Sequence, residues 1–428
     1  MLTHIFWHWL ELNSDIGKSP ASLQRLQELR LKRIVAECFR TPYYKKKWNK
    51  AGLSETSVST LDDLQKLPFL EKREIQASGE SIINPRFPKN ALKKTRTTGT
   101  TGFPLSIYTD PRSDAEWDAT MLFALTQSGC GPLDKRCYIR RIRRDRDYRQ
   151  NKYRQNMLQR LGFFSLSRIS VFDAPGEIAQ ELGRIRPDFL YAYPSVASLV
   201  AQELLAKGSF LPLRKFLSHG EMLLPHVRHL VKRAFGAESF NFYGSAEFPR
   251  LGWECEAHEG IHTIPRAAII EVVDGDGEPV GEGERGEIVV SGLVNSAMPL
   301  IRYRLGDMGV WSGEPCSCGR PFPLIKSLEG RKDDFVVLPN GRKVSPRSVA
   351  IRDWVEGVRE CSILQTTKTT IMVYYVPAER PWPAMERSFV RQMRRSIPDK
   401  SVKIVVRAVK SIPRGPTGKL AKVRSLVR

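Results

Sequence analysis

The pattern of hydrophobic and polar residues predicts helices early in the chain and alternating strands and helices in its middle. Residues 23–40 place apolar side chains at helical spacing, and the Pro42 that follows suits a helix end. Between residues 160 and 250, strand-like runs (SRISVF, DFLYAY, SFNFY) alternate with helical runs (PSVASLVAQELLAKG, LPHVRHLVKRAFG). This alternation is typical of βα units, so we predict a mainly parallel sheet with helices on its faces.

The pattern changes again toward the C-terminus. Residues 265–311 contain alternating segments and Asp-Gly turns, which indicate β-hairpins. After Gly330 a new run begins with DDFVVLPNGRKVSP and continues with a helix candidate and the strand-like runs TTIMVYYV and SVKIVVRAV. We therefore predict an α/β protein with two domains. Residues 1–330 form the larger one, with a β-rich subdomain at about 265–325, and residues 331–428 form a small α+β domain.

The composition is that of a folded globular protein. Hydrophobic residues make up 41% and charged residues 27% of the 428 positions, which excludes a disordered, collagen-like or coiled-coil chain. Seven cysteines are too few for a disulfide scaffold of this size, so we expect a reducing, cytoplasmic location. The N-terminal residues lack a basic leader and a cleavage site, and no run of 18 uncharged apolar residues occurs. We therefore expect neither a signal peptide nor a transmembrane segment.

The chain is strongly cationic, with a formal net charge of +22, and this favours anionic partners. Residues 139–154 (IRRIRRDRDYRQNKYR) hold eight Lys or Arg against two Asp. A solvated face is one interpretation. The others are a landing site for the phosphates of coenzyme A, an acidic carrier protein or a membrane surface. No zinc-finger, RNP or helix-turn-helix pattern supports specific nucleic-acid binding, and cationic attraction alone would be nonspecific.

Two histidines mark one face of the predicted N-terminal helix. His4 and His8 stand at i and i+4 and together could hold a metal. Because no third ligand lies nearby in the sequence, we favour an amphipathic docking helix.

Five short segments contain the residues expected of a phosphate-handling site. Residues 97–104 (TTGTTGFP) combine glycines, which allow close backbone approach, with hydroxyl and amide donors for phosphate oxygens. This is not a Walker A loop, because the Gly-Lys-Ser/Thr ending is missing and a strand is expected to follow. The others are NFYGSAE (241–247), YRLGD (303–307), GRKDD (330–334) and PRGPTGK (413–419). They offer an aromatic ring for a base, carboxylates for Mg²⁺ or ribose, and a lysine.

In their order and separations these segments resemble the adenylate-forming superfamily of acyl-CoA ligases, luciferases and peptide-synthetase adenylation domains. Within it the chain resembles the phenylacetate-CoA ligase family, since it also contains the segments Tyr193–Ser195 (YPS), Ser218–Glu221 (SHGE) and Cys316–Arg320 (CSCGR). The resemblance extends over about residues 95–419. It implies a large α/β domain with an attached β-barrel-like subdomain, and a mobile C-terminal domain.

The resemblance also implies a role for each matching residue. Thr98, Glu247 and Lys419 would be catalytic, with Glu247 binding Mg²⁺, and Asp333 would be the hinge about which the small domain turns. Gly220, Glu221 and Tyr243 would line the adenine slot, Ser245 and Ala246 would lie near the substrate carboxylate, and Asp307 and Arg331 would hold the ribose. The nucleotide-binding residues would be Thr97, Thr98, Gly99, Thr100, Thr101, Gly102, Gly220, Glu221, Tyr243, Gly244, Ser245, Ala246, Asp307 and Arg331. The family's loop usually begins with serines, and the threonines here retain a hydroxyl donor.

The implied reaction is ATP-dependent activation of a carboxylic acid to an acyl-AMP, followed by transfer to a thiol. We expect an aryl or arylacetic acid as substrate, with Tyr191, Tyr193 and Phe248 as candidate pocket residues, and coenzyme A as acceptor. One alternative is an adenylating enzyme that transfers the acyl group to the pantetheine of an acidic carrier protein or to an amine. The other is a non-catalytic protein that binds anions or nucleic acid.

A second group of residues suits a structural zinc site. Cys255, Cys316, Cys318 and His262 offer three sulfurs and one nitrogen, a donor set that Zn²⁺ binds tetrahedrally. His258 is the alternative to His262, and unliganded cysteines in hairpin loops are the alternative to a metal. The remaining cysteines carry no motif and are expected to be packed thiols: Cys38, Cys130, Cys137 and Cys361.

Overall fold

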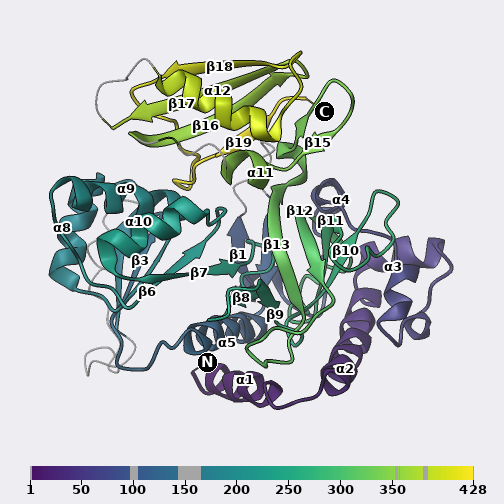
Figure 1. Cartoon of the computed structure of the whole chain (residues 1–428). Coiled ribbons are helices and arrows are strands. Elements are labelled where there is room, and N and C mark those ends of the chain that lie inside the picture. Colours follow the sequence, from purple (N-terminus) through teal and green to yellow (C-terminus); the bar gives the residue numbers. More distant parts are fainter. Residues whose placement is uncertain are drawn as a thin grey trace. The chain divides into compact units, whose positions relative to one another are not determined.

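The computed structural model in Figure 1 describes residues 2–96, 105–142, 165–351, 355, 357–378 and 384–427. Its contacts divide the chain into two compact units, each built from two stretches of sequence. The first unit comprises residues 1–129 and 242–327, and the second comprises residues 130–241 and 328–428. The predicted domain boundary at residue 330 stays a prediction.

The helices of the first unit come from its N-terminal stretch. The α-helices are α1 (Leu2–Asp15), α2 (Pro20–Phe39), α3 (Pro42–Lys50), α4 (Lys72–Ser78) and α5 (Pro111–Gln127), and the 3₁₀ turns are η1 (Glu55–Ser57), η2 (Asp62–Lys66) and η3 (Lys89–Ala91). Helix α2 begins with the Ser19 side chain accepting from the Ser22 amide and with Pro20 in its first turn. Helix α5 begins on an Asp110 cap that accepts from Arg112 and Ser113. These caps satisfy amides that the helix itself leaves without a partner.

An antiparallel sheet forms the rest of the first unit. Its strands are β10 (Ala268–Val273), β11 (Arg285–Gly292), β12 (Tyr303–Ser312), β13 (Leu324–Arg331), β9 (Ile261–Thr263) and β8 (Gly252–Glu254), in that order. The last residues of β7 (Glu238–Tyr243) pair with β8. The predicted Asp-Gly turn joins β10 to β11, where the Asp274 carboxylate accepts three backbone amides. A separate hairpin, β1 (Lys93–Arg96) with β2 (Ser106–Thr109), flanks the threonine-glycine loop, so a strand follows that loop as predicted.

The second unit contains the predicted βα units. Its parallel strands are β6 (Lys215–His219), β5 (Phe189–Ala192), β3 (Arg136–Arg140) and β4 (Leu166–Ser170), in that order. Helix α8 (Pro175–Ile185) follows β4, α9 (Pro194–Ala206) follows β5, and α10 (Pro225–Phe235) follows β6. Each helix begins on a proline, whose fixed φ suits the first helical position. Strands and helices alternate here as the sequence pattern predicted, with short apolar runs in the strands and longer runs of helical spacing in α9 and α10.

The C-terminal stretch of the second unit forms a smaller α+β structure. Its elements are η4 (Lys332–Asp334), β14 (Val336–Val337), β15 (Lys343–Val344), α11 (Pro346–Ile351), β16 (Val358–Thr367), β17 (Thr370–Pro377), α12 (Met385–Ser396), β18 (Lys403–Ala408) and β19 (Val423–Ser425). Four of these strands make a mixed sheet in the order β18-β17-β16-β19. The fold is mixed α/β with a sheet that contains parallel strands, as predicted.

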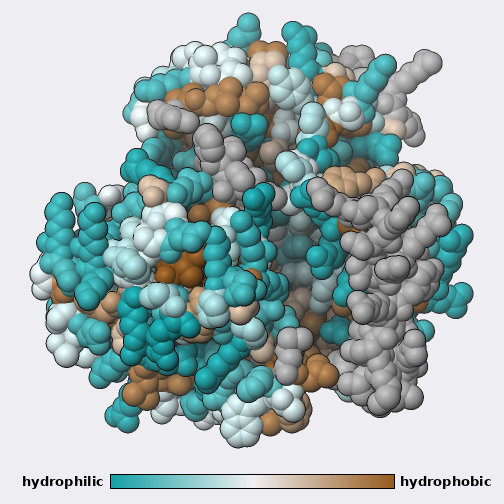
Figure 2. All heavy atoms as spheres, turned by 180° about the vertical axis from the view of Figure 1, so that it is seen from behind, coloured by the Kyte–Doolittle hydropathy of each residue, from teal (hydrophilic) through white to brown (hydrophobic). Residues whose placement is uncertain are grey.

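The surface and the isolated cysteines agree with the sequence-based expectations. Hydrophilic residues predominate on the face drawn in Figure 2, and hydrophobic ones occupy small separate areas. None of the helices described combines the length and apolar character that crossing a membrane requires. The four cysteines without a motif are buried thiols: Cys38, Cys130, Cys137 and Cys361.

Candidate active site

The threonine-glycine loop itself, residues 97–104, lies outside the described residues, and so do Arg143 to Arg154 of the basic stretch. The remaining predicted site residues fall into two groups, one in each compact unit, and each group is described separately.

In the first unit, the segment after β7 forms a tight turn. The Ser245 amide donates to the Phe248 carbonyl at 2.8 Å, and the Phe248 amide donates to Ser245 Oγ at 3.1 Å. Gly244 is required here, because a Cβ at this position would lie 2.5 Å from the Pro249 carbonyl oxygen. Ala246 completes the turn, and Phe248 is buried beneath it.

Two tyrosine–carboxylate hydrogen bonds connect this turn with strand β12. Tyr243 Oη donates to Asp307 Oδ2 at 3.0 Å, and Tyr303 Oη donates to Glu247 Oε1 at 3.3 Å. Both carboxylates are half-buried, while both tyrosines are buried. The structure thus brings the predicted residues of the 243–247 segment and Asp307 together at one place, with their carboxylate oxygens held in fixed positions.

In the second unit, the Lys419 side chain lies directly over Gly220. A Cβ on Gly220 would meet Lys419 Cε at 2.9 Å and Lys419 Nζ at 3.0 Å, and Gly220 has a φ of 73°. Both facts favour glycine at this position. The Lys419 ammonium also lies 5.6 Å from the centre of the Tyr193 ring, within the range of a cation–π contact.

Glu221 connects the residue after Lys419 with the start of helix α9. Its carboxylate accepts the Leu420 amide at 2.7 Å, the Ser195 amide at 3.1 Å and Ser195 Oγ at 3.1 Å. Arg414 donates to Ser195 Oγ at 2.7 Å and forms an ion pair with Glu360. Lys419 is therefore held over Gly220 by a network of charged and polar groups rather than by one contact.

Burial also affects the aromatic residues near Lys419. Burial and the nearby Glu221 carboxylate raise the pKa of Tyr193 to about 12. Its hydroxyl therefore stays neutral at physiological pH.

The Tyr191 ring stacks on the His219 ring, with ring centres 4.1 Å apart. Tyr191 and Tyr193 thus border the segment that leads to Gly220.

Arg331 and Asp333 lie where β13 passes into η4. Arg331 is the last residue of β13 and Asp333 is exposed within η4. Gly330, just before them, has a φ of 102°, and a Cβ there would lie 2.8 Å from Pro346. The backbone at this position thus adopts a conformation that favours glycine.

The four predicted zinc ligands lie together in the first unit, with their ligand atoms all within 4.8 Å of one another. Cys255 follows β8, His262 lies in β9, and Cys316 and Cys318 lie in the loop between β12 and β13. Strand β13 pairs with β9 so that Leu324 lies opposite His262, and this register brings the two loops together.

The distances in this cluster suit a tetrahedral zinc site. The Cys255 and Cys316 sulfurs are 3.6 Å apart, and two sulfurs bound tetrahedrally at about 2.3 Å from Zn²⁺ would be about 3.8 Å apart. His262 Nε2 lies 3.2 Å from Cys318 Sγ, while its Nδ1 faces the Phe322 carbonyl at 3.3 Å. A backbone carbonyl at Nδ1 favours the tautomer whose Nε2 is free to bind a metal.

The alternative ligand, His258, is held differently. Its Nδ1 lies 2.9 Å from Glu254 Oε1, and it is not part of the cluster.

Two contacts hold the cysteine loops against each other. Glu259 accepts from the Ser317 amide and hydroxyl, and Arg320 pairs with Glu256.

Burial shifts the ionisation of the clustered groups. It raises the pKa of the Cys255 and Cys316 thiols and lowers the pKa of His262, which favours the neutral imidazole. Burial also opposes ionisation of Cys318, but hydrogen bonds from Arg320 and the neighbouring thiols hold the pKa of Cys318 below its usual value. A divalent cation would favour the thiolate form of all three cysteines. The donor set, spacing and tautomer therefore fit Zn²⁺.

Sequence reasoning gave no role to two residues of the site. Arg414 lies in the same loop as Lys419, and this proximity is the only feature of the sequence that points to a role for it. Glu360 lies in β16 with no motif around it, and only the folded structure places it against Arg414.

The sequence is similar to one family model and to two known proteins described here. Residues 163–298 match the family model for AMP-binding enzymes. The phenylacetate-coenzyme A ligase of Thermus thermophilus is 29% identical over 340 residues, which cover 76% of this chain and 74% of the relative. The phenylacetate-coenzyme A ligase of Escherichia coli is 25% identical over 333 residues, covering 75% and 74%.

One solved structure shares the fold over nearly the whole chain. It is a 2-hydroxyisobutyryl-CoA ligase in the postadenylation state, in complex with an acyl-AMP. The TM-score is 0.79 at 20% identity, and the match covers 97% of this chain and 91% of that one.

Proposed function

We propose that this chain, which belongs to the adenylate-forming superfamily and is phenylacetate-CoA ligase-like, uses ATP to join a carboxylic acid to coenzyme A. The observation that best supports the proposal is the position of Lys419. Its ammonium lies over Gly220 and Tyr193, and Glu221 holds the adjacent Leu420 amide. A cation fixed beside the SHGE segment is suited to a reaction that builds negative charge on phosphate.

The first half-reaction makes the carboxylate a good acyl donor. A carboxylate oxygen attacks the α-phosphorus of ATP, a new P–O bond forms, and the bond to the pyrophosphate leaving group breaks. Lys419 would stabilise the charge that develops on the phosphoryl oxygens. Mg²⁺, when bound, would neutralise phosphate charge, and Glu247 is the residue proposed to hold it.

The family resemblance assigns parts of the nucleotide to individual residues. We assign the β- and γ-phosphates to Thr97–Gly102, the adenine to Gly220, Glu221 and Tyr243, and the ribose to Asp307 and Arg331. Ser245 and Ala246 would lie near the substrate carboxylate. The Tyr243–Asp307 hydrogen bond would fix the carboxylate that receives the ribose hydroxyls.

In the second half-reaction, the thiolate of coenzyme A attacks the carbonyl of the acyl-AMP. The C–S bond forms, and AMP leaves with the electron pair of the broken C–O bond. We propose that the C-terminal domain turns about Asp333 between the two steps, which would withdraw Lys419. The Arg414–Ser195 and Leu420–Glu221 hydrogen bonds, which join this domain to earlier residues, would then hold the adenylating arrangement only.

We propose an aromatic acid as substrate. The named relatives are phenylacetate-coenzyme A ligases, and we keep the aromatic rings of Tyr191, Tyr193 and Phe248 as the candidate pocket residues. The second candidate acceptor is an acidic carrier protein, which the net charge of +22 would favour, or an amine.

Pyrophosphate release measured with a panel of carboxylic acids tests the function directly. We expect release to require ATP, Mg²⁺ and an acid, with aromatic acids preferred, and thioester to form when coenzyme A is added. Thioester formation only on a carrier protein would select the second acceptor. ATP binding without turnover of any acid would contradict the proposed activity.

Replacing Gly220 with alanine should reduce adenylation by at least about tenfold. The new Cβ would strain a backbone with a φ of 73° and displace Lys419, and such strain costs about 1–3 kcal/mol of stability. Gly208→Ala is the matched control, since Gly208 has a φ of 61° with nothing within 4 Å of the added Cβ. Both variants should lose stability in urea unfolding, but only Gly220→Ala should lose adenylation. An equal loss in both would mean that the contact with Lys419 does not matter.

A further inference from the structure

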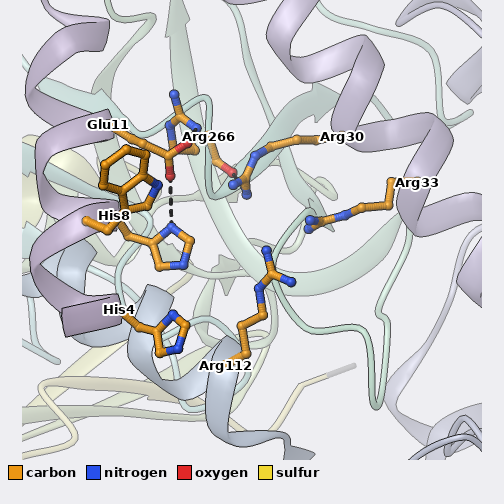
Figure 3. A pocket seen from close by; sticks show the side chains of 8 residues that line it. His4, His8, Glu11, Arg30, Arg33, Arg112 and Arg266 are labelled. Carbon is orange, nitrogen blue, oxygen red and sulfur yellow. Dashed lines mark hydrogen bonds and ion pairs between the residues drawn. The ribbon is translucent and has the colours of Figure 1, made fainter. Parts of the chain in front are cut away.

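A cationic pocket lies in the first unit, formed by residues of α1, α2 and α5 together with Arg266 (Figure 3). Its volume is about 570 Å³, and its lining contains four arginines, two histidines, one tryptophan and one glutamate. None of the residues assigned to the ligase reaction lines it. The proposed ligase reaction therefore does not explain this pocket.

Two of the four arginines are buried and are held by carboxylates. Arg30 donates to Glu116 at 3.0 Å and to the Arg266 carbonyl at 2.9 Å. Arg266 pairs with Asp15 at 2.8 Å and with Glu11 at 3.1 Å. These ion pairs hold the two buried arginines in place and engage the acidic residues at this end of the pocket.

The other two arginines are exposed and have no acidic partner within the residues that the structure describes. Arg33 of α2 donates to the Leu293 carbonyl at 3.1 Å. Arg112 lies in the first turn of α5 and forms no ion pair in this part of the structure. Figure 3 shows the guanidinium groups of Arg30, Arg33 and Arg112 pointing toward one hollow from different sides.

The two histidines of α1 border the same hollow. His8 is oriented by Glu11, whose carboxylate lies 2.8 Å from Nδ1, and its Nε2 lies 3.6 Å from Glu116. His4 is exposed one helical turn away, and Figure 3 shows its ring below that of His8. Because guanidinium groups surround the two rings, a metal cation would be repelled here.

Positive charge in the pocket exceeds what its carboxylates balance. Burial lowers the pKa of Arg30, and the nearby charges of Arg266 and Arg33 lower it further, although Glu116 opposes them. A bound anion would relieve this repulsion and give the exposed guanidinium groups an acceptor.

We propose that this pocket binds the phosphate group of a phosphomonoester, as a site separate from the ligase chemistry. Donors approach the hollow from three helices, and a tetrahedral phosphate has oxygens in several directions, whereas a carboxylate offers two in one plane. The pocket is also larger than one phosphate, and the exposed Trp7 at its edge offers a surface for the organic part of the ligand.

The phosphate could belong to a soluble metabolite or to a lipid headgroup, and α1 gives a reason to test both. Leu2, Phe6 and Leu10 follow one another at i, i+4 and i+8, with exposed fractions of 64%, 57% and 42%. At about 100° per residue this stripe faces away from His4 and His8 on the same helix, so the lipid arm of the test asks whether the exposed apolar residues of α1 add to phosphate binding.

The double variant Arg33→Gln/Arg112→Gln tests the site, because both side chains are exposed and their loss should not disturb folding. The control is Arg25→Gln/Lys32→Gln, which removes the same charge from exposed positions outside the pocket lining. Binding of inorganic phosphate and of glucose 6-phosphate is measured by isothermal titration calorimetry at constant ionic strength. A second arm measures co-sedimentation with phosphatidylcholine vesicles, with and without phosphatidic acid.

We expect the parent and the control to bind phosphate or phosphatidic acid vesicles alike, and the pocket variant to bind at least about tenfold more weakly. Binding of the soluble phosphates alone would identify a metabolite site. Binding that requires phosphatidic acid would identify a lipid headgroup. Equal binding in the pocket variant and the control, or no binding of either probe by the parent, would overturn the proposal. Retained pyrophosphate release in the pocket variant would show that the site is separate from the ligase reaction.

Discussion

Replacing Lys419 with alanine should lower the rate of acyl-AMP formation by about 100- to 1,000-fold, the range expected when one preorganised charge-stabilising donor is removed. The structure gives the physical reason. The ammonium is fixed by packing against Gly220 and Tyr193, so its charge needs no reorganisation as charge develops on the α-phosphate. Acid-dependent exchange of labelled pyrophosphate into ATP measures this step.

The same variant should keep the second half-reaction, and this separates a catalytic role from misfolding. Supplied acyl-AMP and coenzyme A should give thioester at a rate close to that of the parent. Lys410→Ala is the matched control, since Lys410 is an exposed lysine in the same C-terminal stretch and should leave both steps unchanged. Equal rates of pyrophosphate exchange in the Lys419 and Lys410 variants would contradict the assigned role.

Local sequence patterns predicted most of the secondary structure. The runs around β5, α9, β7 and α10 were predicted correctly because their lengths, periodicity and flanking prolines and glycines agree on one kind of element. The hairpin between β10 and β11 followed from its Asp-Gly turn, where Asp274 accepts the turn amides. These are all interactions between residues close in sequence.

Contacts between distant residues could not be predicted in the same way. The Tyr303–Glu247 and Arg414–Ser195 hydrogen bonds join residues 56 and 219 positions apart. They depend on strand register and on packing between elements, which the hydrophobic pattern does not specify. The resemblance to a known family identified Glu247 and Lys419, but it said nothing of the residues that position them.

The N-terminal pocket illustrates the same limit. The sequence showed His4 and His8 on one helical face, and it offered either a metal or a docking helix. Arg30, Arg112 and Arg266 are far apart in the sequence, and only the fold places them around these histidines. Their charge changes the expected ligand from a cation to an anion.

The zinc site predicts the second large effect. Purified protein should contain about one zinc per chain, and Cys316→Ser should abolish zinc binding and cost about 4 kcal/mol of unfolding free energy. Cys316 is buried, its sulfur lies 3.6 Å from Cys255 Sγ, and the loop that carries it joins β12 to β13. Without the metal, the two remaining thiols, the new hydroxyl and the imidazole would lack the cation that they hold in common, so the two loops should separate.

Cys130→Ser is the matched control, because Cys130 is equally buried but lies outside the cluster. It should keep its zinc and lose about 1 kcal/mol, the usual cost of a single substitution. Elemental analysis measures the metal, and urea unfolding with and without a chelator measures stability. The chelator should destabilise the parent and the Cys130 variant but not the Cys316 variant, which has already lost the ion. Zinc-free parent protein with unchanged stability in chelator would mean that the four side chains pack as unliganded groups.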